Sequence, residues 1–381
     1  IYKIFGPGIL MATAAIGGSH LVSSTQAGAL FGWSLAIFIL LINFFKYPFF
    51  LANVQYTMAT KKSLIEGYAS LGNSWLWLFT VLAVIAAVVN TAAVSMFAAS
   101  LLGYFIPIKL TINILSFIII FACVLILIAG KYNLLNNVSK IIMITLSIAT
   151  VVAVVMAVTK DVNSTLTDDF ISPSAWTIAS LGFIVILTGW MPAPIEISSI
   201  GSIWLKNQIK QTNINAKNAL LDFNVGFIVT AILALFFLAL GALVLHGSAY
   251  EFKDGIAFSH QLVTMYSTVI GDWSRLLIAF IAFACMFGTS ITVIDGYGRA
   301  VAEAFSLIRK NRSASNRSVA IWTIFISIIG FLIIIYFASS MRTMLDFAMI
   351  LSFTTTPIFA FLNYKLVRST KLPKELQNGM F

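Results

Sequence analysis

The sequence predicts an all-α integral membrane protein with ten transmembrane helices arranged as two inverted five-helix repeats. Of its 381 residues, 60% are hydrophobic and only 9% are charged. A soluble protein of this length cannot bury so much apolar surface, because a single core stops growing near this size. Apolar runs of about 20 residues, long enough to span a bilayer, recur along the chain. The first run of each half also contains residues that interrupt helices, a feature typical of secondary transporters.

The apolar runs place five helices in each half of the chain. The first five lie near 6–30, 34–58, 74–104, 110–130 and 141–159. The second five lie near 174–203, 220–246, 272–308, 318–338 and 344–366. We therefore expect residues 1–160 to form the first repeat and residues 161–381 to form the second repeat with a C-terminal tail. An odd number of helices in each repeat gives the two repeats opposite orientations in the membrane.

The net charge of +10 is a topology signal. The N-terminus and the loops after the even-numbered helices carry 16 basic residues: Lys3, Lys61, Lys62, Lys131, Lys140, Lys206, Lys210, Lys217, Arg309, Lys310, Arg312, Arg317, Lys365, Arg368, Lys371 and Lys374. The opposite side carries five: Lys109, Lys160, Lys253, Arg275 and Arg342. By the positive-inside rule both termini are cytoplasmic and the protein is a multi-pass protein of the plasma membrane. This distribution requires no nucleic-acid partner.

Helices 1 and 6 contain matching interruptions. Gly17, Gly18 and Ser19 interrupt helix 1, and Gly189, Pro192 and Pro194 interrupt helix 6. Proline removes a backbone donor, and paired glycines lower the cost of non-helical dihedral angles. Lipid offers no hydrogen-bond partner to the freed backbone. Two such breaks therefore predict a solute site near the middle of the membrane.

Few ionisable residues fall inside the expected helices, where they are costly and typical of a transport pathway. His20 follows the first break and is either a structural histidine, a cation ligand or a proton-sensitive gate. Glu196 lies four residues after Pro192 and can face a solute or pair with a basic residue. Asp295 can pair with Arg299 four residues later, or it can bind a cation. The remaining charged residues within the spans are Lys46, Asp222 and Glu303.

Met191, Ser290 and Thr292 complete the set of candidate ligands. A methionine at a backbone break can be apolar filler or a soft metal ligand. Ser290 and Thr292 form an oxygen-rich stretch with Asp295, suited to sodium or a second cation. The two cysteines form no metal cluster with the three histidines, and no cluster of residues indicates an enzyme or a bound cofactor.

Three stretches resemble the NRAMP family of divalent metal transporters. These are "GPGIL…QAGALFGWSL" in helix 1, "MP" at the break of helix 6 and "GTSIT…GYGRAVAEAF" in helix 8. The resemblance covers residues 6 to 366. It implies a LeuT-type fold and uptake of manganese or iron, usually coupled to protons.

The residues at the family's metal site differ in this sequence. Gly17 stands where the family has a metal-binding aspartate, and His20 where it has an asparagine. Met191 keeps the methionine ligand, whereas Ala193 replaces the proton-linked histidine. The acidic residues of helix 3 correspond to Asn90 and Ala93, and the glutamine of helix 10 corresponds to Ala348. The chain thus resembles a divergent branch of the family, comparable to the NRAMP-related magnesium transporters. In such a branch we expect metal selectivity and proton coupling to be altered.

The sequence supports a leading function and an alternative. The leading hypothesis is a secondary transporter of a divalent metal cation. It binds the metal through His20, Met191 and Glu196, with Gly17, Ser19 and Asp295 completing the site, and has weak or no proton coupling. The alternative is a sodium-coupled transporter of a small organic solute such as an amino acid, whose carboxylate would meet backbone N–H groups at a half-helix N-terminus. A sensor or channel-like conduit is a third possibility.

Overall fold

The chain folds into a bundle of α-helices. A computed structural model describes residues 6–130, 132–159, 171–212, 214–247, 253–311, 313–337 and 340–377. These residues form fourteen α-helices, with no strand among them. Six helices are long and apolar enough to cross a membrane, and three shorter apolar helical stretches accompany them. Lys3, Lys131, Lys160, Arg312 and the expected repeat boundary at 160/161 lie outside the described residues.

The first half of the chain contains the five expected helices and a short helix that was not expected. The elements are α1 (Pro7–Ala15), a π-helical turn (Ser19–Ser24), α2 (Thr25–Phe31), α3 (Ala36–Thr60), α4 (Leu64–Leu71), α5 (Asn73–Gly103), α6 (Ile112–Ile128) and α7 (Tyr132–Thr159). The sequence does contain a signal for α4. Ser63 and Glu66 form a capping box in which each side chain accepts a hydrogen bond from the other's backbone N–H.

The second half repeats this pattern. Its elements are α8 (Leu181–Trp190), α9 (Ile197–Gln211), α10 (Ala216–Val244), α11 (Gly255–Ile270), α12 (Arg275–Ile308), α13 (Asn316–Tyr336) and α14 (Met341–Ser369). Helix α11 was not expected; it begins after Asp254, whose side chain accepts a hydrogen bond from the Gly255 N–H. The predicted all-α membrane architecture is confirmed.

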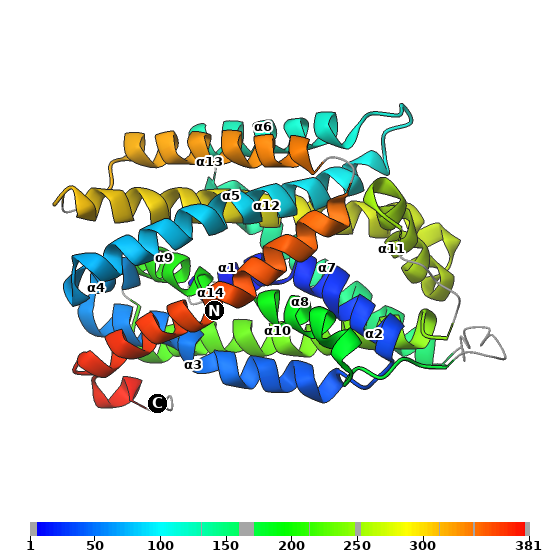
Figure 1. Ribbon diagram of the computed structural model, residues 1–381, viewed down its shortest axis with the longest axis horizontal. Coiled ribbons are helices and arrows are strands. Elements are labelled where there is room, and N and C mark those ends of the chain that lie inside the picture. The colour runs from blue at the N-terminus through cyan, green and yellow to red at the C-terminus, as the bar shows by residue number, and fades with distance from the viewer. Residues whose placement is uncertain are drawn as a thin grey trace.

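The interrupted helices lie in the middle of the bundle (Figure 1). Helices α5 and α12 pass along one side of them, and α3 and α10 pass along the other. Helices α6 and α13 form an outer layer against α5 and α12. Helix α14 crosses the bundle and packs against both α5 and α8. Among the described residues, the backbone around the centre of the bundle is therefore helical except at the two breaks.

Helix α10 packs against the two parts of helix 1 through close backbone contacts. A Cβ atom on Gly8 would lie 2.3 Å from the Asp222 carbonyl oxygen, and one on Gly28 would lie 1.9 Å from the Leu238 carbonyl oxygen. Both distances are too short for any side chain. In lipid, small residues drive helix association because they let backbones approach closely. These glycines thus fix α1 and α2 against one continuous helix.

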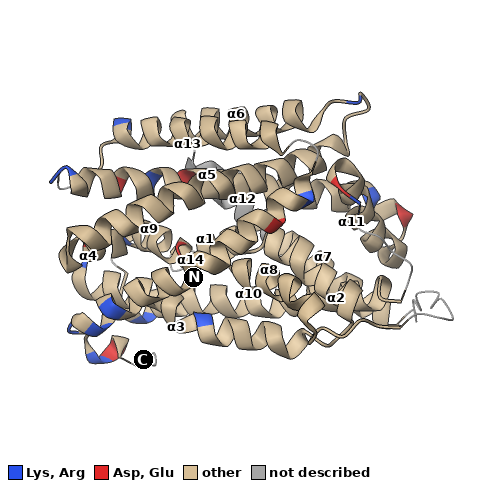
Figure 2. Ribbon diagram, in the orientation of Figure 1, with Lys and Arg blue, Asp and Glu red and all other residues tan. Residues whose placement is uncertain are grey.

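The outer surface is that of a membrane protein. Large apolar side chains such as Phe117 and Phe121 on α6 and Ile328 on α13 are about half exposed. Many of the Lys and Arg residues lie at the end of the bundle that carries α4 and the C-terminal segment (Figure 2). We call this the α4 end.

Candidate functional site

The first interruption lies at Ile16–Gly18, as the glycine pair predicts. Helix α1 ends at Ala15, and the chain resumes as a π-helical turn at Ser19. The Gly17 carbonyl accepts hydrogen bonds from the N–H groups of His20 and Leu21, at 3.2 and 2.9 Å. The break is therefore tightly folded, and the Gly17 carbonyl is satisfied within the protein.

The second interruption covers Met191–Glu196, between α8 and α9. Pro192 and Pro194 both fall inside it. Gly189 has a different role, because it lies within the last turn of α8. A Cβ atom there would come within 1.9 Å of the Met349 carbonyl oxygen, so this glycine allows α14 to cross α8 closely.

The two interruptions line one cavity, about 30 Å³ in volume. This volume accommodates one or two water-sized species, since a water needs about 10–15 Å³. The lining residues come from both breaks, from α5 and from α12: Ala14, Ala15, Gly18, Ser19, Asn90, Val94, Trp190, Pro192, Ala193, Pro194, Ile197, Thr289, Val293 and Tyr297. The predicted meeting of the two breaks around one small space is therefore present.

Two polar residues of the cavity wall, Asn90 and Tyr297, are linked by hydrogen bonds to a third buried polar side chain, that of Glu196. The Asn90 amide donates to the Tyr297 hydroxyl at 2.9 Å, and that hydroxyl donates to Glu196 Oε1 at 3.1 Å. Glu196 is 1% exposed. Asn90 Oδ1 and Glu196 Oε2 have no hydrogen-bond partner. Two buried acceptor oxygens next to the cavity wall therefore have no donor in the protein, and a bound water or ion is one way in which such atoms are satisfied.

Ser19 and His20 occupy different positions relative to the cavity. Ser19 lines it, and its hydroxyl donates to the Ala15 carbonyl at 2.7 Å. The His20 ring is fully buried between helix 1 and α10, with Nε2 2.9 Å from the Thr230 carbonyl and Nδ1 3.1 Å from that of Ala15. His20 thus connects the end of α1 to α10 and does not line the cavity.

Gly17, Gly18 and Met191 complete the immediate surroundings of the breaks. A Cβ atom on Gly18 would lie 2.6 Å from the Trp190 ring, so the first break touches the end of α8 at this point. A Cβ atom on Gly17 would lie 3.2 Å from Thr289, a tight but adjustable contact. Met191 is fully buried in an apolar cluster with residues such as Ala27. Met191, His20 and Glu196 are not among the residues that line the cavity, and their role as a ligand set stays a prediction.

Asp295, Ser290 and Thr292 lie away from the cavity wall. Asp295 forms an ion pair with Arg299, whose Nε lies 2.9 Å from Oδ1 and 2.8 Å from Oδ2, and it lines a separate cavity near the start of α13. The Ser290 and Thr292 hydroxyls each donate to the carbonyl four residues earlier in α12. The predicted second-cation site at Ser290 and Thr292 also stays a prediction.

The wall residues that sequence reasoning missed include Trp190, Thr289 and Tyr297. The last two lie on one face of α12 with Val293, each four residues from the next, and the same spacing relates Asn90 and Val94 on α5. This spacing is the only sequence signal for them. It is weak, because most such faces form ordinary apolar cores.

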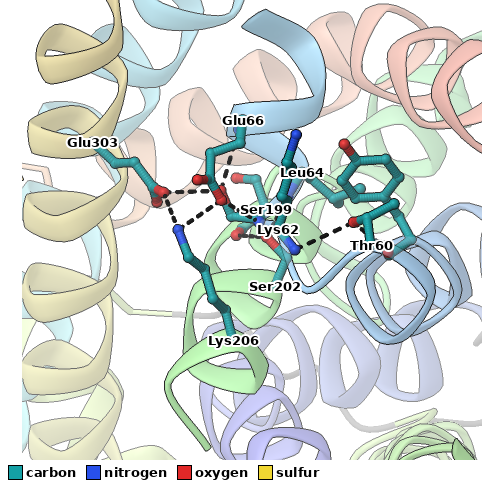
Figure 3. Close-up of polar contacts among 10 residues, drawn as sticks. Thr60, Lys62, Leu64, Glu66, Ser199, Ser202, Lys206 and Glu303 are labelled. Carbon is teal, nitrogen blue, oxygen red and sulfur yellow. Dashed lines mark hydrogen bonds and ion pairs between the residues drawn. The ribbon is translucent and has the colours of Figure 1, made fainter. Parts of the chain in front are cut away.

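A charged cluster joins three helices at the α4 end (Figure 3). The Lys206 ammonium lies 2.6 Å from Glu66 Oε2 and 3.1 Å from Glu303 Oε1. The Ser63 hydroxyl donates to the same Glu303 oxygen at 3.0 Å. These residues belong to α9, α4, α12 and the turn before α4. The cluster therefore ties both halves of the chain together on one side of the cavity.

Comparison with known proteins places this geometry in context. A family model described as "Natural resistance-associated macrophage protein-like" matches residues 8–381. An uncharacterized protein of Pasteurella multocida (strain Pm70) is 50% identical over 370 residues, which cover 96% of this chain and 85% of that protein.

Two solved structures are similar in fold. The Eremococcus coleocola manganese transporter, in complex with an aromatic bis-isothiourea compound, has a TM-score of 0.69 at 12% identity, covering 96% of this chain and 86% of that one. MhsT in complex with L-phenylalanine has a TM-score of 0.63 at 14% identity, covering 94% and 87% respectively. The predicted LeuT-type fold is confirmed by these likenesses.

Proposed function

Because the chain belongs to the natural resistance-associated macrophage protein-like family, we propose that it moves a divalent metal cation across a membrane as a secondary transporter. The main observation in support of this proposal is that both helix breaks line one small cavity in the middle of the bundle. Irregular backbone at membrane depth is tolerated where it is buried in protein or lines a water-filled space. Membership of this family makes the chain a transporter and not an enzyme.

The site proposed for the metal combines the predicted residues with the wall that surrounds them. Glu196 is a buried acid whose Oε1 accepts a hydrogen bond from the cavity-lining Tyr297. A divalent ion that sheds its water needs a nearby negative charge, because isolated charge in a low-dielectric site is very costly. We propose that Glu196 supplies this charge in place of the acid lost at Gly17, and that Ser19, His20, Met191 and Asp295 contribute in other states of the transport cycle.

Transport is proposed to proceed by alternating access. The α4 end is closed by the Lys206 cluster and by the contact of α1 with α10. Opening this end requires α1 and α9 to separate from their neighbours, and reclosing it returns the empty site to the other face. We assign the α4 end to the cytoplasm, from the positive-inside rule, with both termini on that side of the plasma membrane.

The proposed proton coupling is weak or absent. Ala193 lines the cavity at the position where the family has a histidine, and its methyl group cannot titrate. Asn90 likewise replaces an acid on α5. Selectivity is proposed to differ from the family's for the same reason, because the ligands that would set it have changed.

Purified protein in proteoliposomes tests the proposal directly. We expect saturable uptake of at least one of Mn²⁺, Fe²⁺ and Mg²⁺, with Mn²⁺ tried first because a structure of this fold is a manganese transporter. Heat of binding by calorimetry gives an independent readout. No uptake and no heat with any of these ions would overturn the proposal, and sodium-dependent uptake of an amino acid would establish the alternative.

A further inference from the structure

The end of α8 presents backbone carbonyls that its own helix cannot satisfy. The last four carbonyl groups of any helix lack intrahelical partners, and they carry the negative end of the helix dipole. After α8 the chain enters the break, where Pro192 and Pro194 have no N–H to donate. At this depth lipid offers no replacement. A donor must therefore come from another part of the protein.

Lys46 of α3 supplies that donor. Its ammonium nitrogen lies 2.6 Å from the Thr188 carbonyl oxygen, 3.2 Å from that of Gly189 and 3.5 Å from that of Ala193. The residue is only 5% exposed. A lysine ammonium can donate three hydrogen bonds, and here it meets carbonyls from both the helix end and the break.

The first break is satisfied in a different way. There the freed carbonyls lie against side chains that carry no permanent charge: Ser19 and His20 at Ala15, Cys285 at Ile16 and Thr289 at Thr13. The carbonyls of the second break therefore meet a lysine side chain, whereas those of the first, among the described contacts, meet none.

The charge of Lys46 is also balanced locally. Glu196 is close enough to interact with it electrostatically, and the C-terminus of α8 adds a partial negative charge. Several carbonyl oxygens with one acid nearby form an environment in which proteins bind alkali-metal ions, because the oxygen ligands replace the ion's hydration shell.

We propose that the Lys46 ammonium, a cation that belongs to the chain itself, occupies a site at the end of α8 that would otherwise bind an alkali-metal ion. The chain thereby assembles its second break without a dissociable monovalent ion. If the ammonium is removed, the same carbonyl oxygens should form a site for Na⁺, K⁺ or a small alkylammonium ion. The transport arm of this proposal rests on the proposed function, whereas the binding arm does not.

Thermal unfolding of purified Lys46→Met and Lys46→Ser variants tests the binding arm. Both are measured in N-methyl-D-glucamine chloride, NaCl, KCl and ethylammonium chloride at equal ionic strength. We expect the melting temperature of at least one variant to rise by several degrees, saturably, with NaCl, KCl or ethylammonium, because an ion bound only by the folded state stabilises it. The wild type and Lys109→Met, altered at an exposed loop lysine, should respond to none of these ions.

The result that overturns the proposal is a melting temperature independent of the cation in both variants. Failure of both variants to fold in every salt overturns it as well, because a bound ion should replace the ammonium. If the chain transports metal, uptake by the responsive variant should fall about tenfold in N-methyl-D-glucamine and recover with the stabilising ion, as expected when the site is left mostly empty. Cation-dependent melting without metal uptake would support the site while refuting the metal-transport function.

Discussion

The Asp222 carboxylate of α10 accepts a hydrogen bond from the backbone N–H of Gly8, at 2.7 Å, and so caps α1 from a helix more than 200 residues away in sequence. The same carboxylate accepts from Gly6 at 3.1 Å and Ile9 at 3.3 Å. Helix α1 has no capping side chain of its own. A carboxylate at a helix N-terminus satisfies orphan donors and interacts favourably with the helix dipole.

We expect Asp222→Asn to loosen α1 at the α4 end. The amide keeps one acceptor but loses the charge, which weakens a contact worth about 1 kcal/mol or more. A cysteine introduced at the buried Met11, in a background lacking Cys123 and Cys285, should react several-fold faster with a membrane-impermeant maleimide in the variant. Lys217→Gln, an exposed change at the start of the same helix, should leave the labelling rate unchanged. Equal rates in all three proteins would show that Asp222 does not hold α1 closed.

Removal of the Lys206 ammonium should open the same end by a different route. Lys206→Met leaves the carboxylates of Glu66 and Glu303 close together without a counter-charge. Breaking a largely buried pair from one side costs about 3–5 kcal/mol. We expect a lower melting temperature and more of the cytoplasm-open state, read as protease or thiol accessibility near α4. Lys210→Met, one turn further along α9 and exposed, serves as the matched control; the idea fails if the two variants behave alike.

The assignment of the metal site rests mainly on Glu196 and His20. We expect Glu196→Gln and His20→Ala to abolish metal uptake while both proteins still reach the membrane, because one loses the acid near the cavity and the other the link from α1 to α10. Tyr297→Phe should reduce uptake, since Glu196 Oε1 then loses the hydroxyl that orients it. Glu375→Gln, an exposed acid in the C-terminal segment, is the control. Wild-type uptake by Glu196→Gln and His20→Ala would refute the assignment.

Metal uptake should leave the proton balance of the vesicles unchanged or nearly so. The cavity wall has alanine at 193 and asparagine at 90, and neither group exchanges a proton at ordinary pH. A pH-sensitive dye inside proteoliposomes measures this during uptake driven by a metal gradient. Strong substrate-driven acidification would mean that another group, with Glu196 as the first candidate, carries the proton.

The close crossing of α2 and α10 should tolerate no side chain at Gly28. A Cβ atom there would lie 1.9 Å from the Leu238 carbonyl oxygen, so Gly28→Ala must push two helices apart. We expect a loss of about 1–3 kcal/mol, the usual cost of overpacking, seen as a lower melting temperature. Gly182→Ala in α8 is the matched control, because nothing lies within 4 Å of its Cβ position. That change should be neutral or stabilising by up to about 1 kcal/mol, from helix propensity alone.

The order of the helices and the place of both breaks could be predicted because their causes are local. Apolar runs of membrane length, the glycine pair at 17 and 18, and the prolines at 192 and 194 act through the backbone of their own segments. The charge of the loops likewise predicts orientation without reference to packing. These signals survive in a single sequence because each needs only neighbours a few residues away.

Which side chains face the cavity was decided only by tertiary structure. Met191 and Pro192 are adjacent in sequence, yet one packs in an apolar cluster and the other lines the cavity, because the chain turns between them. Asp295 pairs with Arg299 on one face of α12, while Tyr297, two residues on, reaches Glu196 from another. Lys46 could have extended to the membrane surface. It turns inward instead because the end of α8 lies beside it, and that relation depends on how two distant segments pack.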